Sequence, residues 1–146
     1  MFLVNYKLQK KSTLFFSALF FFFYIQSVYA GIETSVENWA KAWSSQNIDL
    51  YLKNYSEEFM PEKGVTREVW ENERKVRLIT PSYIKVVLSG IKVNQYSENS
   101  ADIEFFQHYQ SNSYTDEVKK HLSMQKVKDR WLIVEEKVVP IDNVAI

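Results

Sequence analysis

Beyond the first thirty residues, the spacing of the apolar residues changes once, near Pro81, and this change constrains the fold more than any other feature. Before Pro81 the apolar residues recur every three or four positions, as they do along one face of a helix. After Pro81 they alternate with polar residues, as they do in a half-buried strand. Helices followed by strands predict an α+β fold in which the helices pack on one face of an antiparallel sheet.

Three helices are predicted before Pro81. Thr34 and Glu37 form a capping-box pattern, and the helix that follows has apolar residues at helical spacing. Asn47 is the predicted N-cap of a second helix, and Thr66 is that of a third helix, which ends before Pro81. The apolar positions of the first helix are Val36, Trp39, Ala40 and Trp43. Aromatic residues at this spacing are typical of a core rather than of a sugar-stacking surface.

About four long strands are predicted after Pro81. The apolar residues of the first strand lie at even numbers up to Leu88 and at odd numbers from Ile91 onward. The change of parity at Ser89-Gly90 predicts a β-bulge, which bends a long strand. Further strands are expected at 101–111, around Leu122 and Met124, and from Trp131 to Val139, the last after a tight turn at Lys128-Asp129. We therefore expect a strongly curved antiparallel sheet.

The first thirty residues have the three parts of a secretory signal peptide. Three lysines, at positions 7, 10 and 11, precede a run of apolar residues from Leu14 to Ile25, and Ala30 ends a cleavage-site pattern. Twelve residues make a helix of about 18 Å, which is shorter than a bilayer core of about 30 Å. We expect cleavage after Ala30, a mature domain at 31–146, and an exported protein, periplasmic or secreted, without a stable membrane span. An uncleaved anchor is the alternative.

Charge and cysteine content exclude several classes of function. Without the first thirty residues the chain has 15 basic and 18 acidic side chains, a net charge of −3. Nucleic-acid binding requires clustered Lys and Arg, so no nucleic-acid partner is expected. The sequence contains no cysteine, which excludes disulfides, thiol catalysis and thiolate metal sites. The domain must therefore be stabilised by its hydrophobic core.

The sequence resembles a known superfamily both in the order of its helices and strands and in particular stretches of residues. The stretch "WAKAWSSQNIDLYLKNYSEEF", from Trp39 to Phe59, resembles the opening of the nuclear transport factor 2-like superfamily, with a Trp-containing helix, a polar turn and a second helix ending in Tyr and Phe. The third helix and a bent sheet ending in "RWLIVEE" also match. The resemblance covers nearly all of residues 31–146 and implies a cone-shaped domain with a cavity between the third helix and the sheet.

A narrower resemblance is to the accessory domain that follows the catalytic domain in some L,D-transpeptidase-like proteins of cell shape. The matching stretches run from Val69 to Ile91 and from Ile103 to Met124. The positions in register in the second stretch are Gln107, Tyr109, Ser111, Tyr114, Asp116, Lys120 and Leu122. The resemblance implies a non-catalytic domain of the bacterial cell envelope that dimerises or binds a partner. This sequence lacks the peptidase domain and its cysteine, so that enzyme's chemistry does not transfer.

The alternation of side chains along the strands and the helical spacing along the third helix predict which side chains line the cavity. They form an apolar floor and a polar mouth: Trp70, Arg74, Arg77, Gln107, Tyr109, Lys120 and Glu135. One interpretation is a site for a small anionic or amphipathic ligand, in which the two arginines hold a carboxylate. The other is a structural network in which Lys120 pairs with Glu135. The sequence leaves both open.

A small-molecule enzyme of the isomerase or dehydratase type is the alternative function. Such an enzyme needs an acid or base inside an apolar cavity. By parity, His108 and His121 point to the convex face, as do Asp102 and Glu104, which leaves only Glu135 inside. We therefore expect no catalytic residue and no cofactor. The two histidines have no metal-ligand spacing, so no metal site is expected.

The convex face of the sheet is a predicted interface. Phe106 and several β-branched or leucine residues share the outward parity, and an exposed apolar patch usually marks a partner surface. The candidates for a homodimer interface are Phe106, His108, Leu132, Val134 and Val138. The alternative is that these are single exposed apolar residues, which are common on protein surfaces. A homodimer, an envelope protein and a small anionic ligand are the expected partners.

Overall fold

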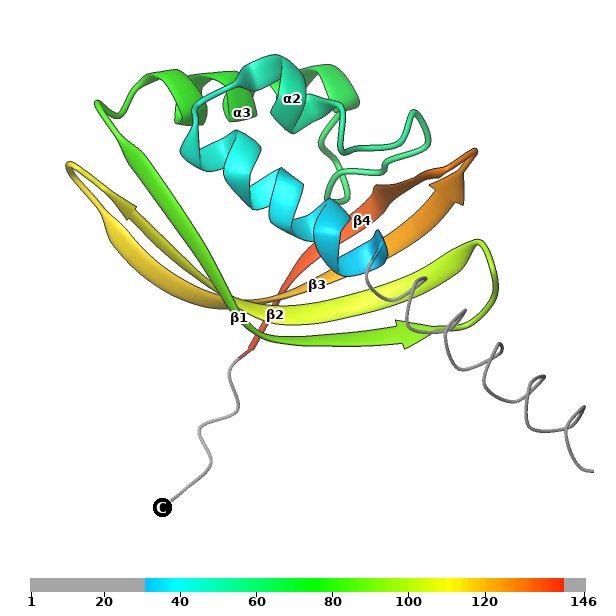
Figure 1. Ribbon diagram of the computed structural model, residues 1–146. Coiled ribbons are helices and arrows are strands. Elements are labelled where there is room, and N and C mark those ends of the chain that lie inside the picture. Colours follow the sequence, from blue (N-terminus) through cyan, green and yellow to red (C-terminus); the bar gives the residue numbers. More distant parts are fainter. Residues whose placement is uncertain (1–30, 141–146) are drawn as a thin grey trace, which may run out of the picture.

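The computed structural model describes residues 31–140, so the predicted signal peptide and the last six residues lie outside it. A first helix covers residues 31–44, followed by α2 (Ile48–Leu52) and α3 (Arg67–Ile79). The strands β1 (Ile84–Gln95), β2 (Ser100–Ser111), β3 (Thr115–Val127) and β4 (Arg130–Val139) form one antiparallel sheet in chain order. The helices all cover the concave face of this bent sheet (Figure 1), which confirms the predicted fold class. Within the described range, no helix has the length and apolarity to cross a membrane.

Two of the three predicted helix caps are confirmed. Asn47 Oδ1 accepts a hydrogen bond from the Leu50 amide at 2.9 Å at the start of α2. Thr66 Oγ1 accepts one from the Val69 amide at 3.2 Å at the start of α3. The predicted cap at Thr34 is wrong, because the chain is already helical at residues 31–33. Thr34 therefore has no free helix N-terminus to cap.

Two β-bulges shape the sheet. The register of β1 against β2 passes from Ser89–Phe106 to Lys92–Glu104, which places the predicted bulge at Gly90. Gly90 has a φ of +61°, and a Cβ there would lie 3.3 Å from the Phe106 ring, so both conformation and space require glycine. A second bulge, not predicted from the sequence, places Val134 as an extra residue of β4 between the partners of Ser123 and Met124. After this bulge, each side chain of β4 lies on the opposite face of the sheet from the one that strict alternation would give it.

The core lies between the helices and the concave face and is rich in aromatic rings, as the sequence predicted. Trp39 is fully buried and makes edge contacts with Trp43 and Phe105 at ring-centroid distances of 5.3 and 6.0 Å. Aromatic pairs in this geometry each contribute roughly 0.5–1.5 kcal/mol beyond their burial. The cluster continues through Tyr51 and Tyr55 to Trp70, whose ring is one wall of the cavity described below.

Side chains near the end of the first helix fix α3 and β1 in place. Ser44 Oγ accepts a hydrogen bond from the Val86 amide at 2.9 Å. Gln46 Nε2 donates to the backbone carbonyls of Leu78 and Pro81, both at 2.7 Å, and thereby satisfies carbonyls at the end of α3. These contacts hold α3 over the sheet and so set the width of the space between them.

Candidate functional site

A cavity of about 700 Å³ lies between α3, the loop of residues 56–66 and the concave face of the sheet. Its sheet side is formed by inward-facing residues of β2, β3 and β4, and its helix side by one face of α3. Six of the seven predicted pocket residues line it: Trp70, Arg74, Arg77, Gln107, Tyr109 and Lys120. Strand parity and helical spacing therefore placed most of this wall correctly.

Glu135 is the exception, and its predicted pairing with Lys120 is wrong. Its side chain is 43% exposed and pairs with Lys137 at 2.7 Å, away from the cavity. Glu136 lines the cavity instead and forms the ion pair with Lys120. The bulge at Val134 is the cause, because one extra residue moves every later side chain of β4 to the other face.

The Lys120–Glu136 ion pair is part of a buried hydrogen-bond network. The two side chains are each only 6% exposed. Tyr55 OH donates to Glu136 Oε2 at 2.8 Å and accepts from Trp39 Nε1 at 2.9 Å. Tyr51 OH lies 2.8 Å from Tyr55 OH. Because the single Tyr55 proton goes to Glu136, Tyr51 must be the donor in that bond.

Neighbouring charges fix the ionisation state of this network. Burial favours the neutral form of Glu136, but Lys120 and Arg74 outweigh it and lower its pKa below the ordinary value. Burial, followed by the negative charge of Glu136, raises the pKa of both Tyr51 and Tyr55 well above the ordinary value. Burial would lower the pKa of Arg74, but Tyr51 and Glu136 outweigh it and raise the pKa. The site at neutral pH therefore holds two cations, one carboxylate and neutral phenols.

Three buried polar atoms of the cavity wall have no hydrogen-bond partner within residues 31–140. They are Trp43 Nε1, Arg74 Nε and Gln107 Oε1, and all three residues line the cavity. A buried polar atom without a partner is uncommon and costs about 1–3 kcal/mol. Because the three atoms are themselves almost fully covered, a bound molecule or a water could bond to them only after a small shift of the side chains of the wall.

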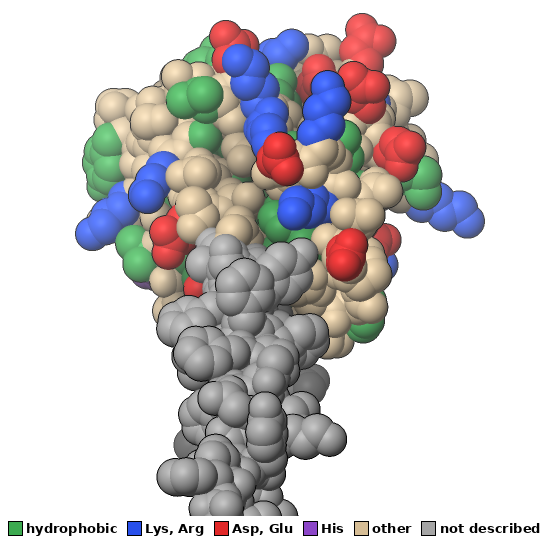
Figure 2. Space-filling view, turned by 45° about the vertical axis from the view of Figure 1, so that its right-hand side comes forward, with side chains coloured by type: hydrophobic (Ala, Val, Ile, Leu, Met, Phe, Trp, Pro, Cys, Tyr) green, Lys and Arg blue, Asp and Glu red, His purple; other side chains and the backbone are tan. Residues whose placement is uncertain are grey.

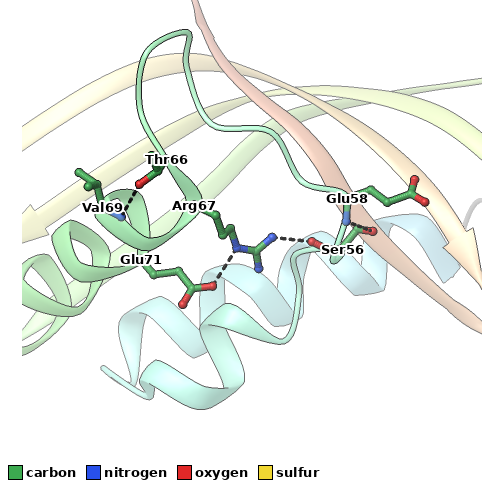
Figure 3. Close-up of polar contacts among 6 residues, drawn as sticks. All are labelled: Ser56, Glu58, Thr66, Arg67, Val69 and Glu71. Atoms are coloured by element: carbon green, nitrogen blue, oxygen red, sulfur yellow. Dashed lines mark hydrogen bonds and ion pairs between the residues drawn. The ribbon is translucent and has the colours of Figure 1, made fainter.

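The loop of residues 56–66 forms the wall of the cavity opposite the sheet, and Arg67 fastens it to α3 (Figure 3). Arg67 donates from one guanidinium nitrogen to the Ser56 carbonyl at 2.6 Å and from Nε to Glu71 at 2.8 Å. Its guanidinium carbon also lies 5.5 Å from the centre of the Phe59 ring. Through these three contacts, the Arg67 side chain ties the loop of residues 56–66 to the first turn of α3.

The mouth of the cavity carries exposed apolar side chains as well as charged ones, and its floor is more polar than predicted. Val76, Tyr114 and Val138 line it although their side chains are 58%, 58% and 60% exposed. The buried ion pair lies deeper, among the rings of Trp39 and Trp43. Val138 was assigned to the convex face, and this was wrong for the same reason as Glu135, since it follows the Val134 bulge. The expected apolar floor and polar mouth are therefore partly reversed.

The convex face carries ion pairs around Phe106. Lys119, the cross-strand neighbour of Phe106, pairs with Glu104 at 2.8 Å, and His108 lies 3.8 Å from Glu117. His121 lies 3.5 Å from Asp102 on the same face, so both histidines point outward as predicted. Leu132 and Val134 are half-buried. In the described part of the chain, no group of three or more His, Cys, Asp or Glu is arranged to hold a metal ion.

The outer surface provides no single-sign charged patch on the face shown in Figure 2. Basic and acidic side chains lie next to one another there. This agrees with the nearly balanced composition and gives no electrostatic footprint for a polyanion on that face.

The chain is similar to one known protein family and to several solved structures. A family model described as the Cds6 C-terminal NTF2-like domain matches residues 31–137. Among proteins with a curated description, none matches. Bd1075 of Bdellovibrio bacteriovorus is a similar solved structure, at 28% sequence identity and a TM-score of 0.68, over 77% of this chain and 40% of that protein.

Two other solved structures show the same fold at lower identity. The helical cell shape determining protein Pgp2 of Campylobacter jejuni, as its K307A mutant, has 20% identity and a TM-score of 0.68, over 75% of this chain and 40% of its own. A putative dehydratase of the NTF2-like family from Streptomyces avermitilis has 10% identity and a TM-score of 0.67, over 80% and 98%. The chain thus spans about 40% of the length of Bd1075 and Pgp2.

Proposed function

The chain belongs to the family of Cds6 C-terminal NTF2-like domains, and from this membership and its cavity we propose an exported, non-catalytic domain that binds a carboxylate-bearing ligand. The observation that carries the proposal is the set of unpartnered polar atoms on the cavity wall, two of which, Trp43 Nε1 and Arg74 Nε, are hydrogen-bond donors. An anion with two oxygens offers acceptors for donors of this kind.

The charges deep in the cavity favour a ligand with a single negative charge. Arg74 and Lys120 are cationic and Glu136 is the buried carboxylate between them, so the second positive charge is offset only by Glu73, which is exposed to water. An uncompensated charge in such a place is costly, and a carboxylate restores the balance. The other charged residues of the lining are the exposed Glu62, Glu73 and Arg77 and the half-buried Asp116. Water screens the fields of the exposed ones.

The same network argues for binding rather than for the isomerase or dehydratase alternative. A general base works best when its pKa is raised toward neutral pH. Lys120 and Arg74 outweigh the effect of burial and lower the pKa of Glu136, and Lys120 and Tyr55 already occupy its oxygens. A carboxylate held in this way is a poor proton acceptor. The dehydratase in the comparison shares the fold at 10% identity, which does not transfer an activity.

Carboxylate binding can be tested by tryptophan fluorescence, because Trp43 and Trp70 line the cavity. We expect hexanoate to change the emission and the neutral hexanamide to have little effect. Arg74→Met should weaken hexanoate binding at least tenfold, since a hydrogen bond to a charged group contributes about 1.5–3 kcal/mol. Lys75→Met, on the same helix but outside the cavity lining, is the matched control. Equal responses to acid and amide would contradict the proposal.

Export and a role in the bacterial cell envelope form the second part of the proposal. The lysines and apolar run of residues 1–30 support export, and the likeness to Pgp2, described as a helical cell shape determining protein, supports the envelope. If the chain is expressed from its own start in a bacterium, the protein in the periplasmic extract should have the mass of residues 31–146. Recovery of the full-length chain in the membrane fraction would instead support an uncleaved anchor.

We also propose a homodimer that forms through the convex sheet face around Phe106. The half-buried Phe106 and Leu132 support this surface, although the surrounding ion pairs make it more polar than the sequence suggested. Light scattering should give twice the mass of the mature chain, and Phe106→Asp should give a monomer with an unchanged circular dichroism spectrum. Ile79→Asp, an exposed apolar site on α3, should leave the mass unchanged. A monomeric wild type rules the interface out.

A further inference from the structure

Both histidines of the chain lie on the convex face of the sheet, beside the surface proposed as the dimer interface. His108 lies two positions from Phe106 on β2, and His121 lies two positions from Lys119, the cross-strand neighbour of Phe106. Histidine is the only side chain whose ordinary pKa lies between pH 5 and 8. We propose that protonation of these two histidines weakens the homodimer, so that it forms at neutral pH and dissociates near pH 5. This inference rests on the proposed interface around Phe106 and adds a means of regulating it.

The other charged side chains of the convex face balance one another. β1 contributes two lysines, β2 contributes two carboxylates, and β3 and β4 each contribute one lysine and one carboxylate. Arg130 at the start of β4 is not part of this face, because it donates to the Lys53 carbonyl at 2.9 Å and so reaches toward the helices. The face therefore has no net charge while its histidines are neutral. The balanced residues are Lys85, Lys92, Lys119 and Lys137, with Asp102, Glu104, Glu117 and Glu135.

Protonation gives this face a net charge of +2, one for each histidine. In a two-fold symmetric dimer both protomers use the same face, so two surfaces of equal positive charge would meet. Their repulsion is stronger in an interface than in open solution, because water and salt ions no longer lie between the charges. At neutral pH no such repulsion opposes association. Uptake of protons therefore shifts the equilibrium toward separate protomers.

The separate protomer stabilises the charged form of His121. Its Nε2 lies 3.5 Å from Asp102 Oδ2, and its Nδ1 lies 3.6 Å from Glu104 Oε1. A neutral imidazole has one N–H, whereas the imidazolium donates from both nitrogens and so suits two carboxylates. On the β4 side, the cross-strand neighbour of His121 is Lys137, whose charge is offset by Glu135 at 2.7 Å. His121 can therefore take up a proton without any contribution from a second protomer.

His108 is the more exposed of the two histidines, at 45% of its side chain. Its Nδ1 lies 3.8 Å from Glu117 Oε2 on β3, and its neighbour on β1 is the exposed Val87. Lys85 and Lys119 are its diagonal neighbours, so protonation adds a positive charge next to two others. A second protomer can cover a neutral imidazole beside Val87 at little cost, whereas an imidazolium would lose its water there. Dimerisation and protonation of His108 therefore oppose each other.

The test measures the dimer dissociation constant of the mature chain by sedimentation at about pH 7.5, 6 and 5 in about 0.1 M salt. Carboxylates, with ordinary pKa values of about 4, keep their charge over this range, so among the side chains only histidine changes. We expect the dissociation constant to rise at least tenfold between pH 7.5 and pH 5. The rise should be smaller in about 0.5 M salt, because salt screens the repulsion. The circular dichroism spectrum should not change with pH.

Replacement of the histidines assigns the effect to them. Glutamine is neutral at every pH, so the double variant His108→Gln/His121→Gln should have the same dissociation constant at pH 7.5 and at pH 5. Glu37→Gln, at an exposed position of the first helix, is the matched control and should keep the pH dependence of the wild type.

A wild-type dimer that is as tight or tighter at pH 5, or a double variant that keeps the pH dependence, would show that the histidines do not regulate the dimer, and the interface would stand. A monomer at every pH would show that the interface itself is wrong, and this inference with it. The wild-type comparison uses the unaltered protein, so it holds even if the double variant does not fold.

Discussion

Lys120→Met is expected to destabilise the domain by about 3–5 kcal/mol, the typical cost of removing one partner from a buried ion pair. Lys120 and Glu136 are both almost fully buried, and methionine keeps the length of the lysine chain without its charge. The variant leaves the Glu136 carboxylate with Tyr55 and Arg74 as its remaining partners. Urea denaturation followed by circular dichroism measures the difference in the free energy of unfolding.

The control for this variant lies on the next residue. Lys119 pairs with Glu104 on the convex face, where both side chains are about a third exposed. Lys119→Met should therefore cost less than about 1 kcal/mol, as is usual for an exposed pair. The double variant Lys120→Met/Glu136→Gln should recover much of the lost stability, because no buried charge is left unpaired. Equal losses at Lys119 and Lys120 would show that the burial of the pair has no energetic consequence.

The effect of Lys120→Met depends on pH in a direction that the pKa of Glu136 determines. In the wild type this pKa lies below its unfolded value, because Lys120 and Arg74 outweigh burial. Its contribution to stability is therefore present above the unfolded pKa, about 4.3, and is lost as the pH falls through the folded pKa. Without Lys120, burial raises the pKa and the carboxylate takes up a proton more easily. The difference between variant and wild type should therefore be largest at pH 7 and smaller at pH 4.

The order of helices and strands could be predicted from the sequence because it depends on local patterns. Asn47 and Thr66 cap the helices that they precede, and each needs only the residues of its own first turn. The bulge at Gly90 was also predictable, since a glycine coincides with the change of parity. The family resemblance led to the same fold, and the family match over residues 31–137 confirms it.

The bulge in β4 could not be predicted, and the candidate site was altered as a result. The strand from Arg130 to Val139 contains no glycine or proline, and its extra residue is Val134. Strict alternation consequently placed Glu135 inside and Val138 outside, whereas the structure has the reverse. The bulge coincides with the Met60 amide donating to the Val134 carbonyl at 3.2 Å, a contact between segments far apart in sequence. Long-range contacts of this kind have no local signature.

The role of Tyr55 was likewise invisible in the sequence, which shows only a tyrosine near the end of the second predicted helix. Its hydroxyl joins residues 39, 51 and 136, three positions that only the folded chain brings together. The sequence did predict the helix face of Arg74 and the strand face of Gln107, both of which line the cavity. It could not show which of the cavity's polar atoms are satisfied within the domain and which are left for a ligand.

Tyr55→Phe is expected to cost about 3 kcal/mol, far more than the loss of a hydroxyl usually does. The Tyr55 oxygen accepts from Trp39 Nε1 and from Tyr51 OH, and donates to Glu136. Phenylalanine leaves two buried donors and one carboxylate oxygen without that partner, and each unsatisfied buried group costs about 1–3 kcal/mol. Tyr51→Phe should cost less, about 1 kcal/mol, because Tyr51 supplies one of the three bonds. Tyr83→Phe, at a half-exposed position, should have an effect within about 0.5 kcal/mol.

The loss of stability at alkaline pH gives a second measurement of the hydrogen-bond network around Tyr55. Burial and then Glu136 raise the pKa of Tyr55 in the folded state, so the phenol stays neutral there when the unfolded chain begins to ionise near its ordinary value of about 10. The resulting stability is complete below that pH and declines as the pH rises above it. Tyr55→Phe removes this group, so its stability should fall less steeply than that of the wild type between about pH 9 and 11. A variant that loses little stability at pH 7 and keeps the wild-type slope would show that the hydroxyl does not connect these residues.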